Sequence, residues 1–204
     1  MKTSLTMLVA GVSLSLSIMA NVYAAEQTFT MSAVSGLTDL KFVEVTPGSS
    51  WSQKDGVIIS EGQGESYLVT QADYDDFVLE MDFKPSDEIN AGVYMRCADI
   101  SKIKANTCYE ANIWDKSKKT QFRTGGIVDR QAVTNAQDTI NQWNHYKLTL
   151  SGDTIEVELN GKVTAILIDS QLKQGFIGFQ HKGSGSVELK NIQLKPLRLG
   201  KVIE

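Results

Sequence analysis

The segment Thr154–Leu167 reads TIEVELNGKVTAIL, and its alternation indicates the fold class of the whole chain. Apolar side chains occupy every second position up to the Asn160-Gly161 pair. A period of two is typical of a β-strand with one buried face and one solvated face. Asn-Gly favours a type I′ turn because both residues tolerate positive φ. The segment therefore predicts a hairpin with strands at Thr154–Leu159 and Lys162–Leu167.

The same alternation recurs in both directions along the chain, and helical periodicity is nearly absent. Strands are expected in eight further segments: Val57–Ser60, Ser66–Thr70, Phe77–Lys84, Ala91–Arg96, Tyr109–Trp114, Tyr146–Leu150, Gly175–Gln180 and Val187–Leu194. Gly62-Gln63-Gly64 and Gly183-Ser184-Gly185 are turn signals that we expect to separate neighbouring strands. Many short strands at this spacing predict an all-β sandwich or barrel.

The N-terminus has the pattern of an export signal. Lys2 precedes a mostly apolar stretch, and Val22-Tyr23-Ala24 supplies a small-x-Ala cleavage pattern. The apolar stretch is short for a membrane span, which disfavours an uncleaved anchor. We therefore expect a signal peptide at residues 1–24 and one domain at residues 25–204. The mature protein is expected to have no membrane span and to be periplasmic or secreted.

The net charge argues against a nucleic-acid partner, and the cysteine content favours an oxidising compartment. The 204 residues carry a net charge of −4, and nucleic-acid binding would need clustered Lys and Arg. Cys97 and Cys108 are the only two cysteines. In an oxidising compartment this pair favours a disulfide over two free thiols. We therefore expect an exported protein that does not bind nucleic acid.

Two of the expected strands share a distinctive polar face. In Ala91–Arg96 and in Tyr109–Trp114, every second side chain faces away from the apolar, buried side of the strand. A disulfide between Cys97 and Cys108 would favour pairing of these two strands. The opposite faces would then merge into one patch of aromatic, amide and charged side chains: Tyr94, Arg96, Glu110, Asn112 and Trp114. Such a patch suits a sugar, whose ring stacks on aromatics while its hydroxyls form hydrogen bonds. The alternative is a solvated sheet face with an Arg96–Glu110 ion pair.

The chain contains two histidines, His145 and His181. His181 lies between an expected strand and a glycine-rich turn, where an acid–base group could act. His145 begins an expected strand. No serine-nucleophile elbow, phosphate-binding loop or EF-hand pattern accompanies them. The sequence makes His181 the candidate acid–base histidine.

An ordered set of segments resembles the 3-keto-disaccharide hydrolase family. The matching segments are Trp51–Ser60, Tyr67–Lys84, Asn90–Arg96, Tyr109–Asp115, Gly125–Val128, Trp143–Tyr146, Asn160-Gly161 and Gly175–Pro196. The resemblance implies a concanavalin A-like jelly-roll sandwich of two antiparallel sheets. It also implies a carbohydrate substrate with a ketone at C3, which acidifies the C2 hydrogen. A base removes that proton, the C1 substituent leaves by β-elimination, and water then adds.

The resemblance also implies a set of site residues. Glu110 or His181 would be the base, and Arg96 or Lys182 would stabilise the enolate. The resemblance gives Asn90, Asn112, Asp115 and Gln180 as substrate-binding positions, and strand parity adds the aromatic residues Tyr94 and Trp114. The family usually has Gln at the position of Asn112, and it has Gln-Asp-His-Gly where this chain has Gln180-His181-Lys182-Gly183, which displaces the histidine by one residue.

We expect no organic cofactor, and a divalent metal is compatible with the sequence. A lectin-like binding module of the cell envelope is the alternative to an enzyme, and an envelope protein of purely structural function is a third interpretation. Loss of turnover with retained binding, on removal of the base, would separate an enzyme from a lectin.

Overall fold

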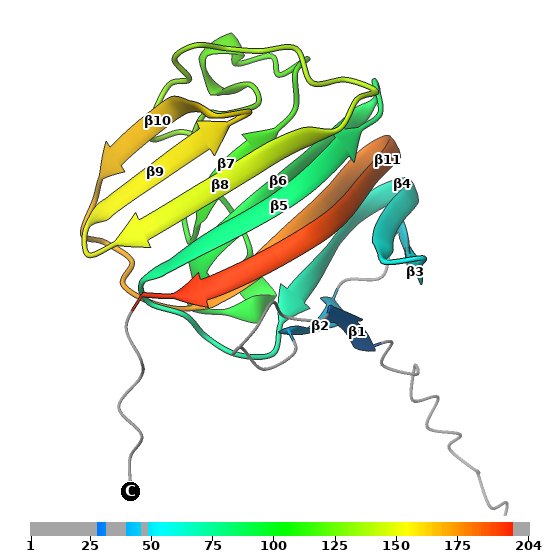
Figure 1. Ribbon diagram of the computed structural model, residues 1–204, viewed down its shortest axis with the longest axis horizontal. Helices are drawn as coiled ribbons and strands as arrows, with labels where there is room; N and C mark the ends of the chain where they lie inside the picture. The colour runs from blue at the N-terminus through cyan, green and yellow to red at the C-terminus, as the bar shows by residue number, and fades with distance from the viewer. Residues whose placement is uncertain (1–27, 32–39, 46–48, 198–204) are drawn as a thin grey trace, which may run out of the picture.

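The computed structural model describes residues 28–31, 40–45 and 49–197. The expected signal peptide lies outside this part of the chain. Within it the chain forms eleven strands and two short 3₁₀ helices and has no α-helix, as the alternation predicted (Figure 1). The strands are β1 Thr28–Met31, β2 Leu40–Val45, β3 Ser49–Lys54, β4 Val57–Thr70, β5 Phe77–Pro85, β6 Ile89–Cys97, β7 Tyr109–Ile113, β8 Asn144–Ser151, β9 Thr154–Leu159, β10 Lys162–Ile168 and β11 Phe176–Pro196. The 3₁₀ helices are η1 Ile100–Lys102 and η2 Thr120–Phe122.

The strands form two antiparallel layers that share the long strands β4 and β11. One layer runs β10-β9-β8-β5 and continues into the C-terminal half of β11. In the other layer β7 pairs with β6, and β6 pairs with the N-terminal half of β11. β4 follows β11 across both layers, with β3 paired to its first half and β2 to its second half. The expected two-sheet sandwich is therefore the fold.

The two glycine-rich segments do not separate strands, contrary to expectation. They lie inside β4 and β11 and face each other, with Gly64 opposite Gly183 and Gly62 opposite Gly185. All four glycines have φ between 93° and 118°, a region that side chains with Cβ rarely adopt. The paired strands use these positions to pass from one layer to the other without losing their partner. A glycine cluster can mark a bend within a strand as well as its end.

The interior between the layers is apolar and continuous. Inward side chains alternate along β5 and β8, from Phe77 to Phe83 and from Tyr146 to Leu150. The hairpin at Asn160-Gly161 is confirmed, with φ of 50° and 76° at the two turn residues. A second, smaller apolar cluster lies on the outer side of β6 beside the Cys97–Cys108 disulfide. No helix in the described ranges is long and apolar enough to cross a membrane.

Candidate functional site

Three neighbouring strands supply the side chains of the candidate site. β6 and β7 pair with Tyr94 opposite Glu110, so the expected pairing of these strands is confirmed. β11 adds to the other edge of β6 and places Gln180 opposite Gly92. The alternation turns Ala91, Val93 and their neighbours into the core and the intervening polar residues outward. The polar residues of all three strands therefore share one outer face.

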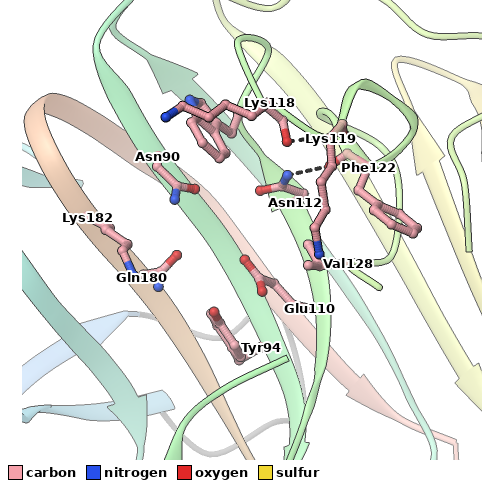
Figure 2. A pocket seen from close by; sticks show the side chains of 12 residues that line it. Asn90, Tyr94, Glu110, Asn112, Lys118, Lys119, Phe122, Val128, Gln180 and Lys182 are labelled. Carbon is pink, nitrogen blue, oxygen red and sulfur yellow. Dashed lines mark hydrogen bonds between the residues drawn. The ribbon is translucent and has the colours of Figure 1, made fainter. Parts of the chain in front are cut away.

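Two neighbouring cavities on this face share part of their lining, and we name each after residues that line it. The tryptophan chamber has a volume of about 320 Å³ and is walled by Trp114, Lys118 and Phe122 from the connection after β7. The loop chamber has a volume of about 430 Å³ and is walled by the disulfide-closed loop at residues 98–107. The chambers share four residues: Tyr94, Glu110, Gln180 and Lys182. Figure 2 shows Glu110 between Tyr94 and Asn112, with Gln180 and Lys182 across the cavity.

Glu110 is the buried ionisable group at the junction of the chambers. Its exposed fraction is 6 %. Desolvation raises the pKa of Glu110 from its ordinary 4.5 to about 7, although a hydrogen bond with Tyr94 opposes the shift. Gly92 makes room for the carboxylate, since a Cβ there would lie 2.9 Å from Glu110 Oε1. A carboxyl group with a pKa near 7 can both take and return a proton at neutral pH.

Two amide oxygens at the site are buried and have no hydrogen-bond partner. Asn112 donates through Nδ2 to the Phe122 carbonyl, which leaves Oδ1 unpaired. Gln180 donates through Nε2 to Glu65 Oε1 at 2.9 Å and to the Tyr67 hydroxyl at 3.2 Å, which leaves its Oε1 unpaired. Buried acceptors are normally satisfied. Among the described residues these two amide oxygens therefore lack a partner, and a donor from water or from a ligand would complete their hydrogen bonding.

Glu65 belongs to the site, although the sequence did not indicate it. It lies on β4 opposite Lys182 and forms an ion pair with that residue at 3.1 Å. Tyr67 donates to Glu65 Oε1 at 2.6 Å. Burial opposes ionisation of Glu65, but the hydrogen bonds from Tyr67 and Lys182 outweigh it and lower its pKa. Only the β4–β11 pairing could have revealed this residue, because Glu65 and Lys182 are far apart in sequence.

Arg96 does not lie in the cleft, so the prediction from strand parity is wrong for this residue. The β6–β11 register slips between Cys97 and Tyr94, and Arg96 has φ of 54° in the resulting bulge. Its fully buried side chain forms an ion pair with Asp76 at 3.0 Å. It also donates to the carbonyl oxygens of Asp75, Gly152 and Leu172. These contacts hold together the β4–β5, β8–β9 and β10–β11 connections, and Arg96 is not among the residues that line either chamber.

His181 also lies away from the cleft. It is fully buried on the opposite face of β11 from Gln180 and Lys182, because adjacent residues of a strand point to opposite sides. Desolvation lowers the pKa of His181. Backbone groups of Ser60, Gly62 and Gly183 surround the ring and oppose this shift. The one-residue displacement relative to the family pattern therefore places the imidazole between the sheets.

The remaining predicted residues divide into two groups. Asn90, Trp114 and Lys182 line the tryptophan chamber together with Asn112 and Gln180. Asp115 instead accepts from the backbone and hydroxyl of Thr139 at 2.6 and 3.0 Å and is not among the residues that line either chamber. Cys97 and Cys108 form the expected disulfide. Among the described residues, no group of three or more His, Cys, Asp or Glu side chains could hold a metal ion.

Comparison with known proteins gives a family match over most of the chain. Residues 38–195 match the 3-keto-alpha-glucoside-1,2-lyase-like domain. No functionally curated protein matches the sequence.

Solved structures give three informative likenesses. A protein from Parabacteroides distasonis ATCC 8503, provisionally named a glycosyl hydrolase, is 26% identical, with a TM-score of 0.64 over 72% of this chain and 90% of its own. The carbohydrate-binding module CBM66 from Bacillus subtilis is 19% identical, with a TM-score of 0.58 over 74% and 94% of the two chains. The β-glucanase of Bacillus licheniformis is 12% identical, with a TM-score of 0.54 over 85% and 100%. The last two likenesses concern the fold alone.

Proposed function

Because this chain belongs to the 3-keto-alpha-glucoside-1,2-lyase-like family, we propose that it cleaves 3-keto glycosides by elimination followed by hydration. Family membership gives the protein a carbohydrate-related function. The observation that supports cleavage is the position of Glu110, a buried carboxyl group with a pKa of about 7 at the junction of two chambers. A lone acid–base group with this pKa suits removal of a proton next to a ketone.

In the proposed reaction Glu110 takes the proton from C2, and the electron pair of that bond forms the enolate of C2 and C3. The enolate then re-forms the C3 ketone while the C1–C2 double bond forms and the C1–oxygen bond breaks. The leaving oxygen takes a proton from solvent as the alcohol departs. Water next adds to C1 and gives one proton to solvent, and Glu110 returns its proton to C2, which restores a 3-keto sugar. The sum is hydrolysis, with Glu110 returned to its starting state.

The enolate is an anion, so a nearby positive charge would stabilise it, and the cationic side chains that line the two chambers are lysines. Lys182 lines both chambers, and Lys118 lines the tryptophan chamber. Lys182 is already paired with Glu65, which fixes its ammonium group at the junction. We assign stabilisation of the enolate to Lys182, because Arg96 is fully committed to Asp76 and three carbonyl oxygens.

Substrate binding is assigned to the neutral polar groups and the aromatic wall. Asn112 and Gln180 line the tryptophan chamber and offer amide groups to sugar hydroxyls. Asn90 adds an amide, and Trp114 offers an aromatic surface to the ring. The alternative is a lectin-like module, which would use these same contacts without turnover.

We also propose that residues 25–204 form one exported domain. The disulfide between Cys97 and Cys108 is compatible with an oxidising compartment. Mass measurement of the exported protein tests this proposal. Cleavage after Ala24 and two protected cysteines are expected, whereas a retained N-terminus would contradict it.

The decisive test of function compares the wild type with Glu110→Gln on a 3-keto disaccharide. Loss of a general base lowers the rate by about 10²- to 10⁴-fold. Glu188→Gln is the matched control, because Glu188 pairs with Lys84 on the other layer and lines neither chamber. His181→Ala separates the two candidate bases, since only removal of the true base abolishes exchange of the C2 hydrogen with deuterated solvent. Sugar binding by the wild type without turnover would establish the lectin alternative.

A further inference from the structure

The loop between Cys97 and Cys108, which lines the loop chamber, is held in place by several contacts. The disulfide joins its ends, and Asp99 accepts a hydrogen bond from the backbone N–H of Ser101 at 2.9 Å inside it. The buried Ile103 packs into the cluster of Tyr67, Tyr94 and Phe176 on the outer side of the sheet. The loop is therefore anchored by covalent and apolar contacts while its remaining face borders the cavity.

One residue of this loop presents apolar surface at the loop chamber. Ile100 lines the chamber and is 46 % exposed. Tyr67 and Tyr94 line the same chamber from the sheet, with their rings edge to face at 5.6 Å. An apolar side chain and two tyrosines in the lining of one chamber suit the carbon-bound hydrogens of a sugar ring or of an alcohol of similar size.

A buried acceptor marks the boundary between the two chambers. Both amide hydrogens of Gln180 are occupied by Glu65 and Tyr67, so the orientation of the amide is fixed with Oε1 unpaired. Gln180 is only 3 % exposed and lines both chambers. The Gln180 side chain therefore offers a fixed amide group where the two chambers meet.

The charges of the two chambers differ, and this difference decides which part of a substrate each holds. Glu65 lines the loop chamber, and its lowered pKa keeps it anionic at neutral pH. An anion disfavours formation of a second negative charge beside it. Lys104 and Lys182 also line the loop chamber. Three lysines, Lys118, Lys119 and Lys182, line the tryptophan chamber, where Glu110 is the one carboxylate among the described lining residues. The enolate therefore belongs in the tryptophan chamber.

We propose that the loop chamber is the subsite for the leaving group, a second sugar ring or an alcohol of similar size. The inference rests on the proposed function and deepens it. The 3-keto ring then occupies the tryptophan chamber, with its C1–oxygen bond at the junction beside Glu110. The disulfide-closed loop, through Ile100, determines how well the enzyme distinguishes a large leaving group from a small one.

The experiment compares two substrates that share the 3-keto ring: a 3-keto-glucosyl-glucose disaccharide and methyl 3-keto-α-glucoside, whose leaving group is methanol. Ile100→Ala should lower kcat/KM for the disaccharide about tenfold relative to kcat/KM for the methyl glycoside. The reason is that loss of the apolar contact affects only a substrate that fills the loop chamber. Ile168→Ala is the matched control, because Ile168 is 79 % exposed on β10 and lines neither chamber.

A binding measurement separates failure of this inference from failure of the proposed function. Calorimetry with Glu110→Gln should give tighter binding of the disaccharide than of the methyl glycoside, and Ile100→Ala in that background should remove the difference. Turnover of both substrates with an unchanged ratio in Ile100→Ala would overturn the subsite and leave the function standing. Preferential disaccharide binding without wild-type turnover would overturn the function and retain the second-ring site.

Discussion

The cleft around Glu110 and the cluster around Arg96 both bury charge, but they treat their polar groups differently. At the Arg96 cluster, Asp76 Oδ1 accepts from Arg96 at 3.0 Å and from the backbone of Gly152 at 2.9 Å. At the cleft, Glu110 is desolvated and two neighbouring amide oxygens are left unpaired. A saturated cluster stabilises the fold, whereas an unsaturated one retains its capacity for a ligand.

The difference also explains why a buried charge alone is a poor guide to function. Arg96 is the largest fully buried side chain among the described residues, and its hydrogen bonds end on three connections and on Asp76. Glu110 is instead desolvated at the place where two cavities share their lining. Stability and activity should therefore respond in opposite ways to changes at the two places.

The largest expected effect is on stability at the Arg96 cluster. Asp76→Ala leaves the buried guanidinium without its carboxylate, which should lower the free energy of unfolding by about 3–5 kcal/mol. Denaturant unfolding measures the change. Asp153→Ala is the control, because the Lys173–Asp153 pair is exposed and should contribute less than about 1 kcal/mol. Equal small losses in both variants would show that the cluster is not a structural anchor.

The next effect has the opposite sign and depends on pH. The pKa of Glu110 is raised from 4.5 to about 7 on folding, so its contribution to stability is complete below pH 4.5 and is lost as pH rises to about 7. Glu110→Gln cannot titrate, and it should gain up to about 3 kcal/mol relative to the wild type above pH 7. Unfolding curves of both proteins from pH 4 to 8 measure the difference. A pH-independent difference would place Glu110 in a solvated environment.

The smallest expected effect sharpens the comparison at the floor of the cleft. Gly92→Ala would place a Cβ 2.9 Å from Glu110 Oε1 and 3.3 Å from the Ala111 carbonyl oxygen. Overpacking of this kind costs about 1–3 kcal/mol and should also displace the proposed base. The cost should fall when Glu110→Ala removes the colliding carboxylate. The same cost in both backgrounds would mean that Gly92 is required by the backbone and not by Glu110.

Prediction from sequence succeeded where the chain is regular. Period-two alternation located the segments that form β5, β8, β9 and β10, and it put Tyr94, Glu110 and Asn112 on one outward face. Regular pairing preserves parity, so a local pattern is sufficient there. The disulfide was likewise predictable, because the chain has two cysteines and an N-terminal pattern that favours an oxidising compartment.

Prediction failed where geometry depends on a distant strand. The bulge that turns Arg96 out of the cleft arises from pairing with β11, and nothing in Ala91–Arg96 signals it. Glu65 joins the site because β4 pairs with β11, a contact that alternation cannot register. The glycine segments show the same limit, since a local turn signal became a bend once a partner strand ran alongside it.

The sequence by itself determined an all-β sandwich, the Asn160-Gly161 hairpin and the two strands that supply Glu110 and Asn112. Only the tertiary structure decided which polar groups remain unpaired, how far burial shifts the pKa of Glu110, and that His181 and Arg96 lie elsewhere. The physical reason is how far apart in the sequence the interacting residues lie. Strand formation follows from alternation between adjacent residues, whereas desolvation and hydrogen-bond saturation depend on atoms brought together from distant parts of the chain.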